Sequence, residues 1–428
     1  MINGALDYLY NLKREGIKLD LTATQDFASH VGNPQSKFKT IHIAGTNGKG
    51  SIASYVYNIL RQKYKTGMYT SPHLLDFNER IILDLNRIPD SYIIDFMNSN
   101  RDYIENLATI YRNPTFFETT TVMAFKYFAD NNADYAAIEV GLGGRLDSTN
   151  IINPEVSVIA QIGYEHYQRL GCSLTSIAHE KGGIIKNGKP VVLLDNKPEV
   201  VAEITKIASV RNSKLVKVSD YCSITDLKFN LDGMSFKLQT PVEEYHITTS
   251  NLGLFQLGNI STAVASMELL PEGSPGKKSI EKGIRESRWP SRFEVISREP
   301  LVIMDSSHNP PAAHALVETF SNFVTQKPVL LIGMLDDKDY FSYMSILRKL
   351  SDSVILTTPD EPSRSLDPDA LAAGIGHMFP SIRIIKDPVE AYNFAIQNYS
   401  CVLVTGSMYL VGMLKKYLGS SVRPFNMD

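Results

Sequence analysis

The sequence predicts an α/β protein with mostly parallel sheets, and two features of its pattern support this fold class. Short apolar runs recur along the chain, each bounded by Gly, Pro or Asp, as expected of strands that are buried on both faces. Segments with helical periodicity lie between these runs, and such alternation is typical of α/β layers. The apolar runs are residues 40–44, 135–140, 156–162, 190–194, 301–304, 328–332, 353–357 and 401–405. The helical segments are residues 51–63, 91–110, 117–129, 258–269, 310–324, 338–350, 388–398 and 408–418.

One region departs from this alternation. Residues 214–248 are rich in β-branched residues, and the pair Asp232-Gly233 between two alternating segments is typical of a hairpin turn. We therefore expect a small antiparallel sheet here, packed on the first domain. Residues 271–292 are rich in Pro, Gly and charge, a composition that marks a boundary crossed by few contacts. We place the boundary between two domains near residue 290.

The composition excludes several classes of protein. The net charge of −3 is spread without a basic block, which argues against nucleic acid and a membrane surface as partners. The cysteines Cys172, Cys222 and Cys401 are far apart, so neither a disulfide framework nor a CxxC metal site is expected. The N-terminus has no signal-peptide core, and no apolar stretch reaches the ~20 residues that span a membrane. We expect a cytoplasmic protein.

The most informative segment is residues 41–51, with the sequence IHIAGTNGKGS. A strand ends there, glycines and a lysine follow, and a helix begins. Glycines allow backbone N–H groups to approach phosphate oxygens, and the helix N-terminus adds about half a positive charge. Lys49 can neutralise the β- and γ-phosphates of a nucleotide, and Ser51 or Thr46 can reach a phosphate or its Mg²⁺. The nucleotide-binding residues expected here are Gly45, Thr46, Asn47, Gly48, Lys49, Gly50 and Ser51.

This loop departs from the usual GxxxxGK[ST] pattern. Ile43 stands where the first glycine is expected, and Gly50 separates Lys49 from Ser51. A glycine-rich turn between a strand and a helix is therefore the alternative interpretation at this point.

Two further polar side chains follow apolar runs. Glu139 lies at the end of the run 135–140, where a carboxylate is costly to bury unless it pairs with or binds a cation. Open α/β sheets bind ligands at the carboxyl ends of their strands, so Glu139 is a candidate Mg²⁺ ligand. The alternative is a salt-bridged Glu beside a glycine-rich turn. His166 follows the run 156–162 with the same geometry, although lone histidines are more often structural.

Together these segments resemble the folylpolyglutamate and dihydrofolate synthase branch of the Mur ligase superfamily. AGTNGKGS resembles the nucleotide loop of that branch, TSPHL at residues 70–74 its next signature, and EVGLGGRLD at residues 139–147 its bacterial members. The resemblance covers nearly the whole chain, with the motifs in the family order. It implies an ATP-binding central domain with a P-loop-type sheet over residues 1–289. It also implies a Rossmann-like glutamate-ligase domain over residues 290–428.

The resemblance implies a set of metal-binding groups. Ser71 becomes a magnesium ligand beside Glu139, and His166 matches a metal-binding histidine, with Glu165 where the family has Asp. Lys181 matches a lysine that is carbamylated in several members. A free lysine has a pKa of about 10.4, and a neighbouring Mg²⁺ would favour the anionic carbamate. A surface salt bridge is the alternative for Lys181, and a monovalent cation is a further expected ion.

The resemblance also implies a folate pocket. Phe117 and Thr119, in the segment FFETTT, would line the pterin site, whereas capping of the following helix by Glu118 and Thr119 is the alternative. Arg145 and Asp147 would face the folate side.

Four residues further along the chain match family motifs. Asn259, in FQLGN, would contact adenine, and an N-cap role is its alternative. Arg292, in WPSRFE, would contact the γ-phosphate. Asp305 and His308, in DSSHNP, would lie near the nucleotide and the incoming glutamate. Ser291 stands where the first of these two family motifs has Gly. Ser306 and Ser307 stand where the second has Gly and Ala.

The implied activity is ATP-dependent ligation of L-glutamate to a folate carboxylate. Phosphorylation converts this poor electrophile into an acyl phosphate, which the amine of glutamate attacks. Phosphoryl transfer needs mainly positioning and charge stabilisation from the protein. The expected acceptors are tetrahydrofolate, extended by γ-linked glutamates, and dihydropteroate, and the protein is expected to be a monomer. The residues expected to act in catalysis are Lys49, Lys181, Arg292 and His308.

Other functions are less compatible with the sequence. A peptidoglycan Mur synthetase shares the loop but usually has an extra N-terminal domain, for which the 44 residues before Gly45 are too few. A P-loop GTPase or regulatory nucleotide-binding protein would need NKxD, which does not occur. Within the folate branch, a synthase that only extends folates remains the alternative to a bifunctional enzyme, because Ser148 stands where Ala is common.

Overall fold

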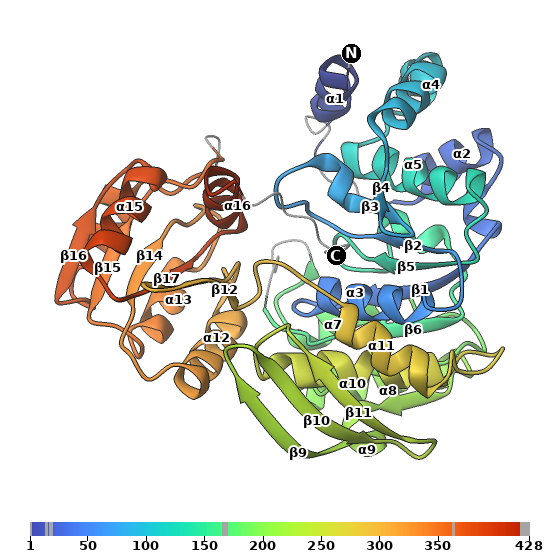
Figure 1. The fold of residues 1–428 in the computed structure, drawn as a ribbon. Coiled ribbons are helices and arrows are strands. Elements are labelled where there is room, and N and C mark those ends of the chain that lie inside the picture. Colours follow the sequence, from blue (N-terminus) through green and yellow to red (C-terminus); the bar gives the residue numbers. More distant parts are fainter. Residues whose placement is uncertain (1, 13–15, 17–19, 165–169, 362–363, 420–428) are drawn as a thin grey trace. The chain divides into compact units, whose positions relative to one another are not determined.

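The computed structural model of the chain confirms the α/β class that the sequence predicts. It contains a mostly parallel eight-stranded sheet, a three-stranded antiparallel sheet and a six-stranded sheet (Figure 1). None of the helices among the described residues is both long and apolar enough to cross a membrane. The structure describes residues 2–12, 16, 20–164, 170–361 and 364–419.

The chain divides into two compact units, each with buried apolar clusters of its own. Both are discontinuous in sequence, because the small antiparallel sheet contributes residues to each. The first unit contains residues 1–224, 237–246 and 258–286, and the second contains residues 225–236, 247–257 and 287–428.

The large sheet of the first unit has the strand order β4-β3-β2-β5-β1-β6-β7-β8. Strands from β2 to β8 along this order are parallel, and β3 and β4 continue the sheet in antiparallel fashion. The central strands are buried on both faces, which explains their unbroken apolar sequences. The strands are β1 (Lys39–Ala44), β2 (Thr66–Tyr69), β3 (Ile81–Leu83), β4 (Asn86–Arg87), β5 (Tyr135–Glu139), β6 (Val156–Ile159), β7 (Val191–Leu193) and β8 (Leu215–Lys217).

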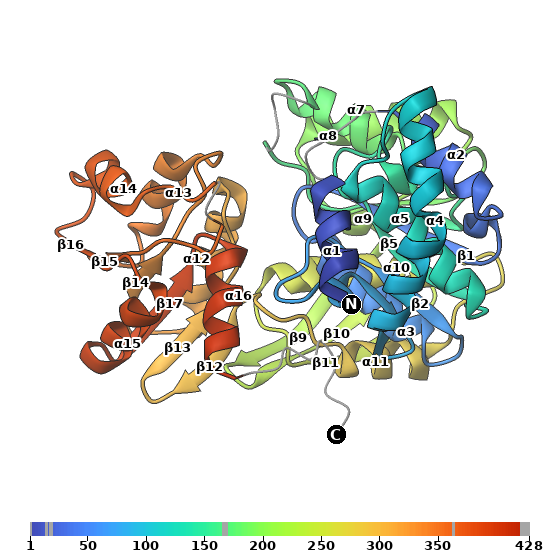
Figure 2. The same cartoon turned by 90° about the horizontal axis from the view of Figure 1, so that it is seen from above.

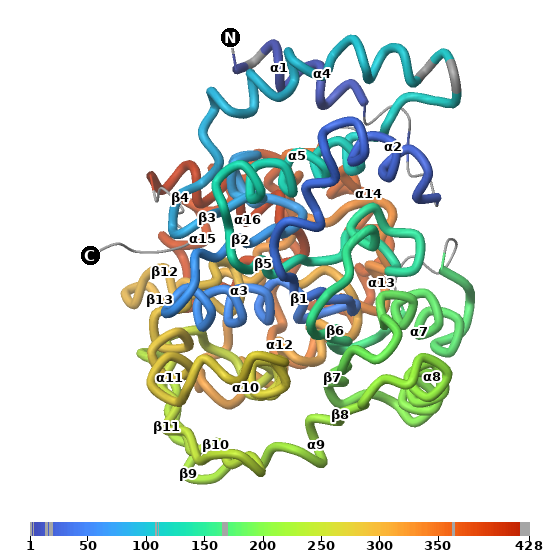
Figure 3. Tube along the Cα trace, turned by 90° about the vertical axis from the view of Figure 1, so that its right-hand side faces the viewer, coloured from blue at the N-terminus to red at the C-terminus, as the bar shows by residue number. Residues whose placement is uncertain are grey.

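Helices cover both faces of this sheet. Figures 1 and 3 show α4 (Asp90–Ile110) and α5 (Phe116–Asp130) over one face, and α3 (Lys49–Leu60) and α11 (Lys277–Glu286) over the other. The remaining helices of this part are α1 (Ile2–Asn11), α2 (Thr22–His30), α7 (Leu174–Gly182), α8 (Pro198–Val210), α9 (Val218–Tyr221) and α10 (Phe255–Glu268).

The antiparallel sheet that the sequence predicts is present. It consists of β9 (Ser223–Asn230), β10 (Gly233–Gln239) and β11 (Glu244–Thr249), in the order β11-β10-β9. The expected hairpin joins β9 to β10, but its two-residue turn is 231–232, and Gly233 already begins the second strand. A Cβ on Gly233 would lie 2.7 Å from the carbonyl oxygen of Thr249, so close backbone approach explains this glycine.

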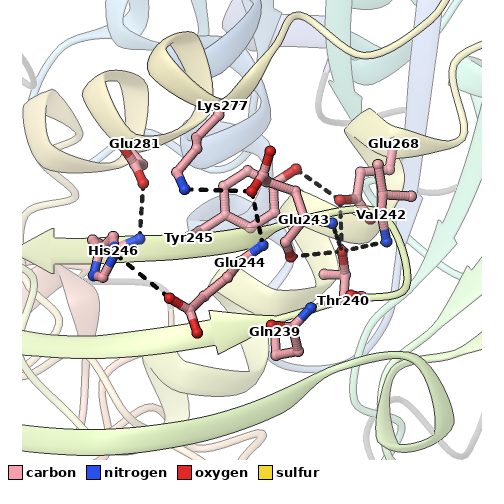
Figure 4. A network of polar contacts seen from close by, with 10 residues as sticks. All are labelled: Gln239, Thr240, Val242, Glu243, Glu244, Tyr245, His246, Glu268, Lys277 and Glu281. Carbon is pink, nitrogen blue, oxygen red and sulfur yellow. Dashed lines mark hydrogen bonds and ion pairs between the residues drawn. The ribbon is translucent and has the colours of Figure 1, made fainter.

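Side-chain hydrogen bonds attach the β10–β11 hairpin to helices of the first unit (Figure 4). Glu268 of α10 accepts from the Tyr245 hydroxyl at 2.7 Å and from the Thr240 hydroxyl at 2.8 Å. The backbone N–H of His246 donates to Glu281 of α11 at 2.8 Å. The hairpin is therefore held by two helices that follow it in the chain.

The six-stranded sheet of the second unit has the order β12-β13-β17-β14-β15-β16, with β12 antiparallel and the other strands parallel. Figures 1 and 2 show α15 and α16 on one face and α12 and α13 on the other. The strands are β12 (Glu294–Arg298), β13 (Leu301–Met304), β14 (Val329–Ile332), β15 (Ser353–Leu356), β16 (Ser381–Ile384) and β17 (Cys401–Thr405). The helices are α12 (Pro310–Phe323), α13 (Tyr340–Leu347), α14 (Pro368–Ile375), α15 (Pro388–Asn398) and α16 (Met408–Tyr417).

Candidate active site

Four neighbouring parallel strands of the first unit, β2, β5, β1 and β6, end at the same edge of the sheet. The register pairs Ile43 of β1 with Glu139 of β5, and Ala44 of β1 with Ile159 of β6. The candidate residues that follow each of these strands are therefore brought together at one carboxyl edge, where open α/β sheets bind ligands.

Two glycines of the loop after β1 are required by its geometry. Gly45 has a φ of 154°, and a Cβ there would lie 2.6 Å from the Cβ of Ala160. Gly48 has a φ of 89° at the N-terminus of α3, and its Cβ would lie 2.6 Å from the Oδ1 of Asn259. Because neither position carries a side chain, the loop backbone can lie close to Ala160 and Asn259. The predicted Asn259 does lie beside this loop, in the interior of α10, so its N-cap alternative is wrong.

Thr46 anchors the loop to the segment after β6. Its backbone N–H donates to the carbonyl of Gln161 at 2.7 Å. Its hydroxyl donates to the carbonyl of Gly163 and accepts from the N–H of the same residue, both at 3.1 Å. The Thr46 hydroxyl therefore forms hydrogen bonds within the protein. Ser51, the other predicted hydroxyl, is buried in the first turns of α3.

Lys49, Glu139 and Ser71 lie together at the sheet edge. The Nζ of Lys49 donates to the carbonyl of Thr46 at 3.1 Å and lies 4.0 Å from the Oε1 of Glu139. The other carboxylate oxygen of Glu139 accepts the N–H of Ser71 at 3.1 Å. Glu139 is only 5% exposed, and this long ion pair and this amide offset part of the cost of burying its charge.

These donors fit Mg²⁺. Among the described residues no group of three His, Cys, Asp or Glu side chains could hold a metal ion. Mg²⁺ does not need such a cage, because it is usually bound by one or two carboxylates together with phosphate oxygens and water. Glu139 with the Ser71 hydroxyl supplies oxygen donors of this kind. The other predicted ligand, His166, and its neighbour Glu165 lie outside the described residues.

Lys181 is buried beside the phosphate loop. It lies on α7, is 5% exposed, and its Nζ donates to the carbonyl of Gly45 at 2.8 Å. The surface salt bridge that was the alternative for Lys181 is therefore wrong, because its amine is buried and contacts the loop.

The segment FFETTT forms the start of α5. The ring of Phe117 stacks on Tyr69 with centroids 6.0 Å apart, and a Cβ on Gly141 would lie 2.4 Å from that ring. Glu118 forms a capping box with Thr115, which confirms the capping alternative for this residue. Thr119 is fully buried, and its hydroxyl has no partner among the described residues.

The structure separates Arg145 from Asp147, which the sequence predicted on the same side. The Arg145 side chain is 48% exposed and donates to Glu180 at 2.9 Å. Asp147 is 5% exposed and accepts from the N–H of Leu142 at 2.8 Å and from the hydroxyl of Thr149 at 2.5 Å. Burial raises the pKa of Asp147 above its ordinary value, although these hydrogen bonds oppose the shift.

In the second unit, the loop after β13 collects the other predicted residues. Asp305 is buried and accepts from the N–H groups of Phe293 and Ser307, both at 2.8 Å. The Nδ1 of His308 lies 3.0 Å from the carbonyl of Ser306, so this nitrogen carries the proton. Arg292 donates to the carbonyl of Ser291 at 3.0 Å. Asp305 thus holds the Arg292 segment against the loop that carries His308.

Sequence reasoning missed a ring of three buried hydroxyl groups that supports this loop. Ser307 Oγ lies 2.9 Å from Tyr343 Oη and 3.0 Å from Thr405 Oγ1, which are themselves 2.8 Å apart. Burial holds the pKa of Tyr343 far above its ordinary value. Only the DSSHNP motif pointed to Ser307, and no local pattern marks the other two residues.

Two family models match the chain. The Mur ligase middle domain matches residues 43–267, and the Mur ligase glutamate ligase domain matches residues 291–408. A Bacillus subtilis protein named dihydrofolate synthase/folylpolyglutamate synthase is 31% identical over 426 residues, 97% of this chain and 98% of that protein. An Escherichia coli protein of the same name is 31% identical over 415 residues, 95% of this chain and 93% of that protein.

Solved structures agree with this relationship. The Mycobacterium tuberculosis folylpolyglutamate synthase complexed with ADP and AMPPCP has a TM-score of 0.92 at 28% identity, covering 98% of this chain and 100% of that one. Escherichia coli FolC in complex with DHPP and ADP has a TM-score of 0.86 at 27% identity, covering 98% of each chain.

Proposed function

This chain belongs to the Mur ligase family, in its folylpolyglutamate and dihydrofolate synthase branch, and we propose that it joins L-glutamate to folate carboxylates using ATP. The observation that carries the proposal is the gathering of the glycine loop, Lys49, Glu139 and Ser71 at one carboxyl edge. Relatives of nearly the same length bear the names of both activities, which supports a bifunctional enzyme acting on tetrahydrofolate and dihydropteroate.

The first step is transfer of the γ-phosphoryl group to the acceptor carboxylate. A carboxylate oxygen forms a bond to phosphorus, the bond to ADP breaks, and an acyl phosphate results. The loop from Gly45 to Gly48, with the N-terminus of α3, offers backbone N–H groups to the phosphates, and Lys49 adds a positive charge. Glu139 and Ser71 would hold Mg²⁺, which when bound would neutralise charge on the phosphates.

The second step is attack of the glutamate amine on the acyl carbon, which releases phosphate and leaves an amide. We assign glutamate to the domain of residues 290–428, where Asp305 and His308 lie on one loop, and the nucleotide to residues 1–289. Arg292 would stabilise charge on the γ-phosphate. We further propose that Asn259 contacts adenine, that Phe117, Thr119, Arg145 and Asp147 contribute to the acceptor site, and that the protein acts as a cytoplasmic monomer.

Lys181 is proposed to be carbamylated, with its anionic group supporting a second cation together with His166, and a monovalent cation is an additional proposed ion. The burial of Lys181 beside the loop supports a role near the phosphates. Electron density of an unmodified lysine in crystals grown with bicarbonate and nucleotide would contradict the carbamate.

Phosphate release with ATP, Mg²⁺ and glutamate tests the function. We expect release with dihydropteroate and with tetrahydrofolate. Release with tetrahydrofolate alone would identify an enzyme that only extends folates. Release that is independent of glutamate and of both acceptors would contradict the folate assignment.

A further inference from the structure

A histidine is buried in the strand that leads to the phosphate loop. His42 of β1 is fully buried, and its Nε2 lies 2.8 Å from the Oγ1 of Thr149. Burial, with Lys186 nearby, holds the pKa of His42 well below its ordinary value, so the ring is neutral at pH 7. Its Nδ1 has no hydrogen-bond partner among the described residues. An unpaired buried nitrogen costs folding free energy, which the hydrogen bond of the other ring nitrogen can only partly offset.

The hydrogen bonds around Thr149 determine the tautomer of His42. The Thr149 hydroxyl has one hydrogen, which it donates to Asp147 Oδ1 at 2.5 Å. It must therefore accept at its contact with His42, which makes Nε2 the protonated nitrogen. A directed chain of hydrogen bonds thus runs from His42 through Thr149 to Asp147.

Asp147 connects this chain of hydrogen bonds to its own loop. Its Oδ1 also accepts the N–H of Thr149 at 3.0 Å, and its Oδ2 accepts the N–H of Leu142 at 2.8 Å. A carboxylate offers about four acceptor positions, and three of those on Asp147 are used by donors from its own loop. It is the centre of the loop 141–149.

The same loop is tied to α7 on its other side. A Cβ on Gly144 would lie 2.8 Å and 2.9 Å from the carbonyl oxygens of Glu180 and Lys181. The Nδ2 of Asn150 donates to the carbonyls of Arg145 at 2.9 Å and Gly183 at 3.1 Å. Because Lys181 itself bonds Gly45, the loop 141–149 reaches the phosphate loop both through β1 and through α7.

We propose that His42 and Thr149 are positioning residues, which hold the loop 141–149, through Asp147, in register with the strand that carries the phosphate loop. The inference rests on the proposed function, because it concerns the alignment of an acceptor carboxylate with the γ-phosphate. Misplacement of reacting groups by about 1 Å can lower a rate roughly 100-fold without loss of binding. Asp147 is the link through which these two residues act on the loop.

The test compares Thr149→Val, which keeps the shape of the side chain, with Thr149→Ser, which keeps the hydroxyl. We expect Thr149→Val to lower kcat about tenfold or more with dihydropteroate or tetrahydrofolate, while the Kd for ADP changes less than about twofold. Thr149→Ser should restore kcat to within about threefold of the wild type. Equal kcat in the wild type and Thr149→Val would overturn the inference, as would a parallel loss of ADP binding, which indicates a merely structural role.

His42 gives a second test that does not depend on activity. Nitrogen NMR of ¹⁵N-histidine-labelled protein, with His42→Gln to assign the signal, should show a neutral ring protonated at Nε2. The Nε2 signal should move in Thr149→Val and not in Thr149→Ser. A ring protonated at Nδ1 would overturn the inference. Absence of acyl transfer in the wild type would instead contradict the proposed function, so the two failures are distinguishable.

Discussion

At the scale of single residues, Ser291 adopts a backbone conformation that its side chain disfavours. Its φ is 62°, in the left-handed region, and its buried hydroxyl has no partner among the described residues. Such a conformation costs a residue with a Cβ about 1–2 kcal/mol. Glycine avoids this cost, but its greater conformational freedom in the unfolded chain cancels part of the gain. We expect Ser291→Gly to raise the free energy of unfolding of the second unit by about 0.5–1 kcal/mol.

Denaturant unfolding followed by fluorescence of Trp289, the only tryptophan, measures this change beside the altered residue. Ser291→Ala is the matched control, because it removes the hydroxyl but keeps the Cβ at positive φ. Equal stabilisation by both variants would attribute the gain to the hydroxyl and contradict the backbone explanation.

Glu139 allows a charge to be removed while a hydrogen bond is kept. In Glu139→Gln the amide oxygen can still accept the N–H of Ser71, but the negative charge beside Lys49 is lost. We expect the Mg²⁺ concentration for half-maximal phosphate release to rise at least about tenfold. Glu155→Gln is the control, since Glu155 precedes β6 at the opposite end of the strand and pairs with Lys189. An unchanged Mg²⁺ requirement in Glu139→Gln would exclude Glu139 as the ligand.

Sequence reasoning at this scale found residues that end strands and missed residues that support them. Glu139 was predicted because a carboxylate at the end of a buried run has few physical explanations, and Lys49 because it lies in a glycine-rich loop between a strand and a helix. The sequence could not tell that Asp147 is buried and Arg145 exposed, because a spacing of two residues in a loop carries no information on burial. His42 lies within an apolar run, and only the position of Thr149, more than a hundred residues later, explains it.

At the scale of elements, α7 depends on the absence of a side chain at Gly144. The φ of Gly144 is not positive, so alanine fits the backbone there, but its Cβ would meet two backbone carbonyls of α7 closer than 3 Å. Backbone yields less easily than a side chain, so Gly144→Ala should displace α7 and with it Lys181. We expect a loss of about 1–3 kcal/mol of stability and a fall in kcat of about tenfold or more.

Gly4→Ala is the control for this change. Gly4 is exposed in α1, and a Cβ there would have no other atom within 4 Å. Alanine at this position should therefore leave kcat unchanged and stabilise the helix by up to about 1 kcal/mol. Thermal unfolding and phosphate release measure both variants. Wild-type kcat in Gly144→Ala would show that the position of α7 does not matter for the reaction.

The elements that sequence reasoning predicted are those with a strong periodic pattern. Every apolar run contains a strand and every predicted helical segment contains a helix, with their ends shifted by a few residues. Strands β2, β3, β4, β12 and β16 were missed because they are short, and β4, β12 and β16 lie at sheet edges, where β16 is largely exposed. The missed helices include α1 and α2, whose amphipathic patterns are short and interrupted. Such elements form through tertiary packing and not through local preference.

At the scale of the whole molecule, the two units have separate cores, so nucleotide binding can be followed through the unfolding transition of each unit. The proposed ADP contacts lie in the first unit, whereas Arg292 of the second unit is proposed to contact only the γ-phosphate. A ligand at 100 times its Kd stabilises the folded form it binds by about 2.7 kcal/mol. ADP should therefore stabilise the first unit alone, and AMPPCP, which carries a γ-phosphate, should stabilise both.

Calorimetry gives the transition of each unit, and Trp289 fluorescence identifies that of the second. Lys49→Ala should abolish both shifts, because the phosphates are then bound weakly or not at all. Arg292→Ala should abolish only the additional effect of AMPPCP on the second unit, since it leaves the ADP contacts intact. If AMPPCP and ADP shift the Trp289 transition equally in the wild type, Arg292 does not sense the γ-phosphate. Charge stabilisation in the transfer step must then come from Lys49 and Mg²⁺ within the first unit.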